Sequence, residues 1–195
     1  MSDTTENLYA MRHSLAHIMA AAIQDIWPEV RLGVGPVVES GFYYDVDLGP
    51  EVKLSEQDFP RIEYKMREII AAAQPFERLE MPVFQAVEWA RQHRQPYKEE
   101  LLNDLQREGT TVAKDIDADT LGVMADGESK VENVSFYRNG EFTDLCRGPH
   151  VKSTDKVGAF KLMRVAGAYW RGKESNPQMQ RVYGVAFETD KALRS

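Results

Sequence analysis

The clearest pattern in the chain is an apolar stripe with helical period near the N-terminus. At about 100° per residue, residues 7–27 place seven apolar side chains in one arc: Leu8, Met11, Leu15, Ile18, Met19, Ala22 and Ile26. This arc predicts an amphipathic helix whose stripe faces a core, and Pro28 ends it. His13 and His17 fall on the opposite side, beside the small Ala20.

Shorter alternating and aromatic runs predict strands and further helices. We expect strands over residues 31–38, 42–47, 75–83, 131–137, 141–146, 159–166, 168–171 and 180–187, and helices over 55–73, 85–92 and 97–107. Asn139-Gly140 provides the turn of one hairpin. Residues 108–130 predict a polar surface loop, because their aspartates lack the spacing of an EF-hand calcium site. This order of elements favours an α+β fold with an antiparallel sheet packed with helices.

Composition narrows the class of protein. The chain has 195 residues, 43% apolar and 28% charged, as expected for a globular protein of one domain or two small ones. A single cysteine, Cys146, excludes an internal disulfide and fits a reducing compartment. Residues 1–6 are polar and acidic, which predicts a disordered tail and no signal peptide. The longest apolar-rich stretch, residues 15–23, is too short to span a bilayer. We therefore expect a soluble, cytoplasmic protein.

The charge distribution bears on partners. The net charge is −7, which by itself argues against nucleic acid. Residues 147–195, however, hold 10 Lys and Arg against 4 Asp and Glu, a net charge of +6, whereas residues 1–146 hold 14 against 27, a net charge of −13. This asymmetry indicates either an electropositive face toward the C-terminus or chance clustering on a solvated surface.

Four residues could carry chemistry. His13 and His17 share one helix face, one turn apart; two such histidines are commonly only solvated, and Ser14 excludes the zinc-protease pattern, which needs Glu there. Cys146 and His150 flank an Arg-Gly-Pro turn that follows a predicted strand. Three imidazoles and one thiolate are the ligands of a tetrahedral zinc site. The same groups could hold and polarise a water without metal, with a histidine as general base.

These residues lie in motifs that resemble one known family. The motifs are His13-Ser14-Leu15-Ala16-His17, Gly35-Pro36, Gly41-Phe42-Tyr43-Tyr44-Asp45, Asp144-Leu145-Cys146-Arg147-Gly148-Pro149-His150, Phe160-Lys161-Leu162-Met163, Gly167-Ala168-Tyr169-Trp170-Arg171-Gly172 and Gln180-Arg181-Val182-Tyr183-Gly184. Over about residues 8–190 the chain is similar to the editing domain of bacterial threonyl-tRNA synthetase. Related domains occur in alanyl-tRNA synthetase and in free-standing alanyl-tRNA editing proteins.

The resemblance implies a proofreading esterase that cleaves serine from tRNA(Thr). An aminoacylation site that recognises the threonine hydroxyl rejects serine weakly, because the missing methyl group changes the binding free energy by only about 1–3 kcal/mol. A second site must therefore hydrolyse the seryl-tRNA(Thr) that forms by mistake. The catalytic residues that it implies are His13, His17, Cys146 and His150. The residues that it implies for binding the aminoacyl group are Tyr44, Asp45, Lys98 and Asp144, of which Lys98 is assigned by spacing. The basic C-terminal segment adds a tRNA-binding set, Lys161, Arg164, Arg171 and Arg181.

Cofactor and partners follow from the same resemblance. The alanyl relatives bind zinc through this ligand set, whereas the threonyl domain works through bound water. We therefore expect no required cofactor, with zinc on His13, His17, Cys146 and His150 left open. The expected partner is the acceptor end of tRNA(Thr) carrying serine, with no membrane. In a full-length synthetase, a catalytic core and a homodimer would be further partners.

The resemblance also sets the expected domain organisation and the alternatives. Residues 7–187 would form the editing domain, with an insertion at about 53–110, and residues 188–195 would begin a linker to the synthetase core. The class II motifs of that core are absent from the sequence, so this chain should not charge tRNA. Two other functions remain open: free-standing editing of alanyl- or D-aminoacyl-tRNA, and a non-catalytic tRNA- or zinc-binding module. The Ala168-Tyr169-Trp170-Arg171 run favours the threonyl type.

Overall fold

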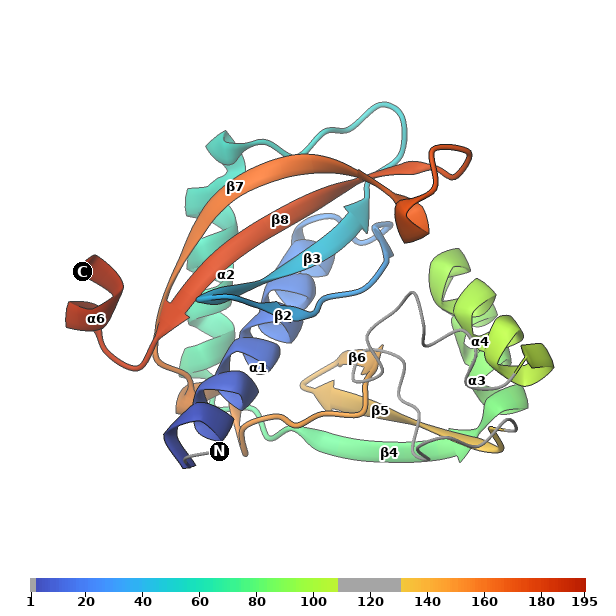
Figure 1. Cartoon of the computed structure of the whole chain (residues 1–195), viewed down its shortest axis with the longest axis horizontal. Coiled ribbons are helices and arrows are strands. Elements are labelled where there is room, and N and C mark those ends of the chain that lie inside the picture. The colour runs from blue at the N-terminus through green and yellow to red at the C-terminus, as the bar shows by residue number, and fades with distance from the viewer. Residues whose placement is uncertain (1–2, 109–130) are drawn as a thin grey trace.

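The computed structural model describes residues 3–108 and 131–195 of the chain (Figure 1). A long helix, α1, opens the fold and runs past one face of a five-stranded antiparallel sheet. The strand order is β1-β3-β8-β7, and β2 pairs with β3 beside β1. The bounds of these elements are α1 Asp3–Ile26, β1 Arg31–Leu32, β2 Val37–Val38, β3 Gly41–Asp47, β7 Ala159–Tyr169 and β8 Gln178–Phe187.

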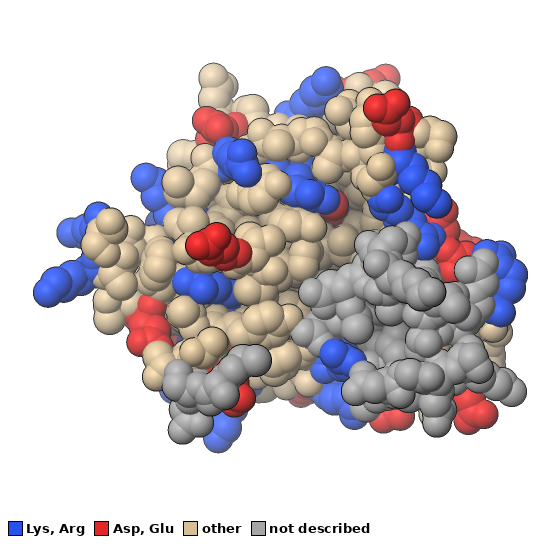
Figure 2. Space-filling model, in the orientation of Figure 1, with Lys and Arg blue, Asp and Glu red and all other residues tan. Residues whose placement is uncertain are grey.

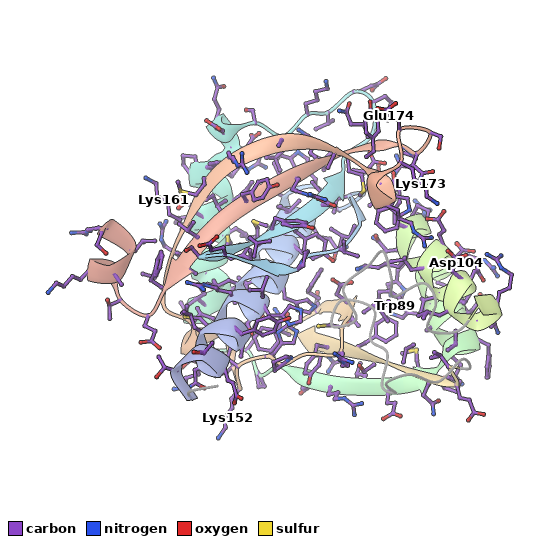
Figure 3. All side chains as sticks on the ribbon, in the orientation of Figure 1. Trp89, Asp104, Lys152, Lys161, Lys173 and Glu174 are labelled. Atoms are coloured by element: carbon purple, nitrogen blue, oxygen red, sulfur yellow. The ribbon has the colours of Figure 1, made fainter. Side chains whose placement is uncertain are left out.

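A second, smaller unit lies beside this sheet. The antiparallel strands β4 (Glu77–Pro82), β5 (Asn133–Asn139) and β6 (Phe142–Leu145) form a three-stranded sheet. The helices α3 (Val83–Gln92) and α4 (Pro96–Glu108) pack on each other and close this unit. Trp89, labelled in Figure 3, projects from α3, and its ring lies 4.8 Å from that of Phe136 on β5.

Each unit has its own hydrophobic cluster. The apolar arc of α1 packs on α2 (Phe59–Ala71) and on β3, with Phe42, Ile62 and Val182 fully buried there. The second cluster joins α3 and α4 to β5 through Leu101, Leu105 and other buried side chains. The expected insertion at 53–110 is thus divided: α2 belongs to the first cluster, and β4, α3 and α4 belong to the second.

One face of the five-stranded sheet carries no helix of the first cluster. α1 and α2 lie behind the sheet in Figure 1, and its other face is turned to the viewer. In Figure 2 this face is mostly uncharged, with separate basic and acidic side chains set into it. The short elements η1 (Glu56–Asp58), η3 (Thr154–Lys156), η4 (Trp170–Gly172) and α6 (Asp190–Arg194) complete the described fold.

The α+β class with antiparallel sheets is confirmed, and most predicted elements are present with shifted ends. α1 begins at Asp3, so residues 3–6 form a helical turn where we expected a disordered tail. Acidic residues in a first turn are stabilised by the helix dipole, which accounts for the earlier start. β7 runs unbroken where two strands were predicted. The predicted loop at 108–130, with Asp115, Asp117, Asp119 and Asp126, lies outside the described residues except for its first position.

The hairpin turn between β5 and β6 lies one residue later than predicted. Asn139 pairs with Phe142, so the two turn residues are Gly140 and Glu141. Asn139 stays in the strand because its side chain is buried and donates a hydrogen bond to Gln74 Oε1 at 3.0 Å. Among the described helices, none is long and apolar enough to cross a membrane.

Candidate functional site

The candidate site lies where the two units meet. α1 is buried on both faces between Ser14 and Ile23, so its histidine face is interior and not solvated. This face meets the end of β6, the core-facing side of β3 and the first turn of α4. The lining side chains are His13, His17, Gly35, Tyr44, Lys98, Asp144, Leu145 and Cys146.

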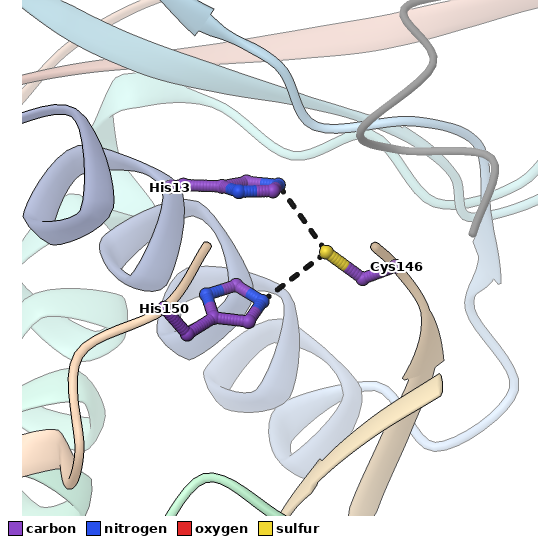
Figure 4. Close-up of side chains that lie close together, drawn as sticks. All are labelled: His13, Cys146 and His150. Atoms are coloured by element: carbon purple, nitrogen blue, oxygen red, sulfur yellow. Dashed lines mark hydrogen bonds between the residues drawn. The ribbon is translucent and has the colours of Figure 1, made fainter. Parts of the chain in front are cut away.

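The thiol of Cys146 lies between two imidazoles (Figure 4). His13 Nε2 is 3.4 Å from Cys146 Sγ, and His150 Nε2 is 3.2 Å from the same sulfur. The Gly148 N–H donates to that sulfur at 3.2 Å. Gly148 has φ +85°, and a Cβ there would lie 2.9 Å from the Tyr137 hydroxyl, so the turn that brings Cys146 and His150 together requires glycine.

The Nδ1 atoms of His13 and His150, which point away from Cys146, both have hydrogen-bond partners in the protein. His13 Nδ1–H donates to the Pro149 carbonyl at 3.2 Å, which leaves its Nε2 unprotonated and facing the thiol. Ser14 Oγ lies 3.0 Å from His150 Nδ1 and accepts the Val151 N–H at 3.0 Å. Burial, with smaller effects from His13 and His17, lowers the pKa of His150 well below its ordinary value. His150 is therefore neutral at pH 7. It contacts Cys146 Sγ and is not among the residues that line the pocket.

His17 is oriented by Asn139, a residue that the sequence indicated only as part of a turn. His17 Nδ1–H donates to Asn139 Oδ1 at 3.2 Å, and Gln74 fixes the orientation of the Asn139 amide. His17 Nε2 is then unprotonated, buried, and without a hydrogen-bond partner among the described residues. It lies 3.9 Å from Asp144 Oδ2. Burial lowers the pKa of His17 to about 4 although Asp144 raises it, so this imidazole is neutral at pH 7.

Asp144 is the charged centre of the pocket floor. Lys98 Nζ lies 3.1 Å from Asp144 Oδ1, and the Leu145 N–H donates to the same oxygen at 2.9 Å. The Tyr44 hydroxyl donates to Asp144 Oδ2. Lys98 and Asp144 are 1% and 3% exposed, so the Lys98 placed by sequence spacing is a buried partner of Asp144 and not a solvated helix residue. Burial, followed by Asp144, raises the pKa of Tyr44 well above its ordinary value, which keeps the hydroxyl a donor.

The free space between these side chains is small. The cavity has a volume of about 10 Å³, close to the minimum that one water molecule needs. Gly35 allows this tight packing, because a Cβ there would lie 2.2 Å from the Tyr44 ring. The pocket thus fits a water, and a larger group requires its lining side chains to move apart.

Three of the four predicted ligands form a group that fits a metal ion. The ligand atoms of His13, Cys146 and His150 all lie within 4.8 Å of one another. Two imidazole nitrogens and a thiolate can serve as three protein ligands of a tetrahedral zinc ion with one open position. The Nδ1 atoms of both histidines are held by Pro149 and Ser14, and hydrogen bonds of this kind usually orient histidine ligands of a metal. His17 lies outside this group, since its Nε2 points toward Asp144.

The remaining predicted residues lie elsewhere. Asp45 follows Tyr44 on β3 and therefore points to the opposite face of the strand, where it accepts two hydrogen bonds from Arg181, at 2.8 and 3.0 Å. The structure thus does not bring Asp45 to the pocket. Arg171 is an ion-pair partner of Asp104 at 2.5 Å and its side chain is 13% exposed.

Lys161 and Arg164 are exposed on β7, and Figure 3 labels Lys161 on that strand. Arg181 lies on the neighbouring strand β8, and its side chain is 27% exposed. These three predicted tRNA-binding residues therefore share the five-stranded sheet. The side chain of Arg171 instead forms an ion pair with Asp104 on α4.

The chain is similar in sequence to one group of known proteins. Residues 134–183 match the family described as "Threonyl and Alanyl tRNA synthetase second additional domain". The chain is 44% identical over 191 residues to a protein named threonine–tRNA ligase from Sulfurihydrogenibium sp. (strain YO3AOP1), with 97% of this chain and 26% of the relative covered. Its identity to the ligase of the same name from Rubrobacter xylanophilus is 44% over 194 residues, with 100% and 26% covered.

A third relative, the threonine–tRNA ligase of Dehalococcoides mccartyi (strain CBDB1), is 46% identical over 191 residues, with 98% of this chain and 28% of the relative covered. The chain thus spans about a quarter of the length of the curated relatives that it matches. The matched family segment contains all but the first residue of β5, together with β6, Cys146 and His150. Residues 134–183 thus match the threonyl and alanyl tRNA synthetase second additional domain, and the chain is homologous to about a quarter of the length of threonine–tRNA ligases.

Proposed function

We propose that this chain hydrolyses the ester bond between serine and tRNA(Thr), as the proofreading domain of a threonyl-tRNA synthetase. One observation carries the proposal. The Nε2 of His17, which has no hydrogen-bond partner within residues 3–108 and 131–195, lines one pocket with the thiol of Cys146 and the carboxylate of Asp144, and this pocket has room for a water. A nitrogen that can accept a proton, a water-sized space and a fixed carboxylate are what ester hydrolysis with an amino-acid specificity needs.

Asp144 and its partners would bind the serine moiety. The carboxylate is held by Lys98, the Leu145 N–H and the Tyr44 hydroxyl, and its remaining lone pair, on Oδ2, can accept a hydrogen bond from the ammonium group of serine. Tyr44, Gly35 and Leu145 pack closely around this space. The lining side chains must move apart to admit serine, and the additional methyl group of threonine needs a further displacement that this close packing opposes. The double sieve then follows from size: serine enters and is cleaved, and threonine is excluded.

The chemical step would be attack by water on the ester carbonyl carbon. His17 Nε2 accepts the water proton, and Asp144 at 3.9 Å stabilises the imidazolium that forms. The bond between the carbonyl carbon and the ribose oxygen then breaks, and the proton passes to that oxygen. The products are serine and tRNA with a free terminal hydroxyl. His13 and Cys146 orient the water, while Ser14 and His150 hold the thiol in place.

His13, Cys146 and His150 would hold a zinc ion if the domain binds one. Bound zinc supplies a Lewis acid that lowers the pKa of a water. The three residues keep their positions in either case, because their second hydrogen bonds go to Pro149, Gly148 and Ser14. The roles of His17 and Asp144 are the same with and without the ion.

The tRNA would reach this pocket with its acceptor end, and the phosphates would contact Lys161, Arg164 and Arg181. In a complete synthetase, further partners would be the catalytic core and a second subunit, in the cytoplasm where tRNA is charged. Editing of alanyl-tRNA is the second candidate function, since the matched family description includes the alanyl synthetase. A non-catalytic binding module is less well supported, because such a module has no need of the unpartnered His17 Nε2.

The test compares deacylation of labelled seryl-tRNA(Thr), threonyl-tRNA(Thr) and alanyl-tRNA(Ala), with and without a chelator. We expect rapid loss of serine and slow loss of threonine and alanine. His17→Ala should reduce the rate by about 10²–10⁴-fold, whereas the matched variant of the exposed histidine, His93→Ala, should not change it. Equal rates on the seryl and threonyl substrates would refute the proposed specificity for serine. No hydrolysis of any of the three substrates would refute the proposed esterase activity. Loss of activity with the chelator would indicate that His13, Cys146 and His150 bind a zinc ion that the reaction needs.

A further inference from the structure

The face of the five-stranded sheet opposite α1 and α2, which no described helix of the first cluster covers, carries an ordered set of aromatic and basic side chains. Tyr43 on β3 pairs directly with Tyr183 on β8, and Tyr183 pairs in turn with Arg164 on β7. In the next row, Asp45 pairs with Arg181. Cross-strand partners point to the same face of a sheet, so these five side chains form one surface across three strands.

Two Arg–Tyr stacks are built on this surface. The Arg164 guanidinium lies 4.2 Å from the centre of the Tyr183 ring, and the Arg181 guanidinium lies 4.0 Å from that of Tyr43. The two rings are 5.5 Å apart. Buried Asp45 binds both Nε and Nη2 of Arg181, which fixes the second stack. The stacks are therefore preorganised, and ordering them on binding costs little entropy.

The charge of this surface points to an anion. Lys161 belongs to the row beyond Arg164, opposite Val185, so the surface carries three basic side chains and one carboxylate, which is already paired. The chain as a whole has a net charge of −7. Figure 2 shows separate blue side chains on this mainly uncharged face, together with red side chains. Aromatic and guanidinium planes next to free cations are the combination that binds unpaired bases and their phosphates.

We propose that this Arg–Tyr surface binds the single-stranded 3′ end of an RNA, with bases stacked on the two Arg–Tyr pairs and phosphates on Lys161 and Arg164. The proposal deepens the proposed function and rests on it for the identity of the RNA. A duplex is a poorer fit, because its bases present no free faces to the rings. The surface adjoins the pocket: Tyr43 and Tyr44 are neighbours on β3 and point to opposite faces of the strand.

This position gives the RNA end a short path to the pocket. Gly35, which lines the pocket, lies in the segment between β1 and β2, both of which pair with β3. The edge of the sheet formed by β1 and β2 therefore lies between an RNA strand stacked over Tyr43 and the pocket that would receive its aminoacyl end. The Arg–Tyr surface would act on binding and not on the chemical step.

The first experiment measures binding of a fluorescent single-stranded RNA tetranucleotide that ends in CCA, and of the same sequence paired in a duplex, by anisotropy. The double variant Tyr43→Leu/Tyr183→Leu removes both rings, and Tyr43→Phe/Tyr183→Phe retains them. Tyr64→Leu is the matched control, since Tyr64 is a 64% exposed tyrosine on α2, behind the sheet. Arg181 is left intact because its loss would leave buried Asp45 unpaired. Arg164→Gln tests the surface with an exposed side chain whose change does not threaten folding.

We expect the wild-type chain to bind the single strand more tightly than the duplex. The double leucine variant should weaken that binding about tenfold or more, the double phenylalanine and Tyr64→Leu variants should bind as the wild type does, and Arg164→Gln should weaken binding and reduce its salt dependence. Equal binding by the double leucine variant and the wild type, or equal binding of single strand and duplex, would overturn the proposal. Circular dichroism checks that each variant is folded, and Arg164→Gln decides the question if the leucine variant is not.

A second experiment separates this proposal from the proposed function. Hydrolysis is measured on seryl-tRNA(Thr) and on the serine ester of adenosine, which lacks the other nucleotides. The double leucine variant should raise KM for the tRNA and leave hydrolysis of the adenosine ester unchanged. If the wild-type chain hydrolyses neither substrate, the proposed function fails, and the oligonucleotide measurement still decides whether the surface binds RNA. An equal loss on both substrates would contradict a role confined to binding.

Discussion

At the scale of single residues, the site depends on which nitrogen of each histidine carries its proton. Pro149 and Asn139 accept the Nδ1–H of His13 and His17, so both Nε2 atoms face inward unprotonated. Only His17 Nε2 is without a partner among the described residues. The hydrogen bond that each Nδ1–H donates to a backbone or side-chain carbonyl therefore selects the tautomer, and the tautomer determines which nitrogen can act as the base.

Asn139 offers a test of this tautomer. Asn139→Ala removes the acceptor of His17 Nδ1–H, and we expect hydrolysis of seryl-tRNA(Thr) to fall about 10–100-fold with little change in KM. Asn139→Asp keeps a carbonyl oxygen at the same place and should restore most of kcat. The rates are measured under single-turnover conditions with saturating enzyme. If the alanine and aspartate variants lose activity equally, the tautomer is not what Asn139 controls.

Cys146 offers a second test, because a thiol between two imidazoles could also act as a nucleophile. We expect a water mechanism, so Cys146→Ser should retain measurable hydrolysis while Cys146→Ala loses most of it. No covalent serine adduct should accumulate on the wild-type enzyme. Mass spectrometry of the Cys146 peptide after rapid quenching checks this. An adduct with the mass of serine on that peptide would replace water attack with covalent catalysis.

At the scale of elements, close backbone approaches shape the pocket as much as the reactive side chains do. The segment between β1 and β2 lies against the Tyr44 ring only because Gly35 has no side chain. The turn after β6 approaches Tyr137 in the same way at Gly148. The donors to Asp144 and to Cys146 are therefore positioned by glycines in two connecting segments.

Gly35→Ala should displace the Tyr44 ring and the hydroxyl that donates to Asp144. Overpacking of this kind typically costs about 1–3 kcal/mol, and we expect a comparable fall in the free energy of unfolding together with a higher KM for seryl-tRNA(Thr). In a Tyr44→Ala background, Gly35→Ala should cost much less, since the ring that it meets is gone. Urea denaturation of the wild type, both single variants and the double variant measures this coupling. Additive costs would mean that the Gly35–Tyr44 contact is not the cause.

At the scale of the whole molecule, two hydrophobic clusters enclose a set of ionisable groups. His17 comes from the first unit and Lys98 and Asp144 come from the second, so the pocket exists only when the two units are packed together. Burial at this junction lowers the pKa of His17 to about 4 and that of His150 well below its ordinary value. Stability and the protonation state of the site are therefore linked.

The linkage predicts a loss of stability in weak acid. In the unfolded chain His17 has a pKa of about 6.5, so below that pH the unfolded state binds a proton that the folded state does not. The free energy of unfolding should be fully retained above about pH 6.5 and should fall by about 3 kcal/mol toward pH 4 from His17, with His150 adding a loss in the same direction. Urea denaturation over this range measures it. His17→Gln should flatten the dependence and His93→Gln should not; a wild-type stability that is constant down to pH 5 would disprove the linkage.

Periodicity and turn residues in the sequence were enough to predict the helices and most strands of this protein. The apolar arc of α1, the hairpin of β5 and β6 and the α+β class all follow from spacing along the chain, because local structure is encoded by neighbours three, four or two positions apart. The resemblance to the family could likewise be recognised from the sequence, since each of its motifs is contiguous, and these motifs nominated His13, His17, Cys146 and His150 as candidate residues. The opposite placement of Tyr44 and Asp45 was also accessible in principle, because successive residues of a strand point to opposite faces.

Only the tertiary structure decided how these residues are divided among roles. It separated His17 from the group of His13, Cys146 and His150, joined His17 to Asn139 across 122 positions of the chain, and committed Asp45 and Arg171 to ion pairs with Arg181 and Asp104. The physical reason is distance along the chain. A hydrogen bond or an ion pair between residues far apart depends on how two units pack, and on which side chains that packing buries, and a local sequence pattern carries neither.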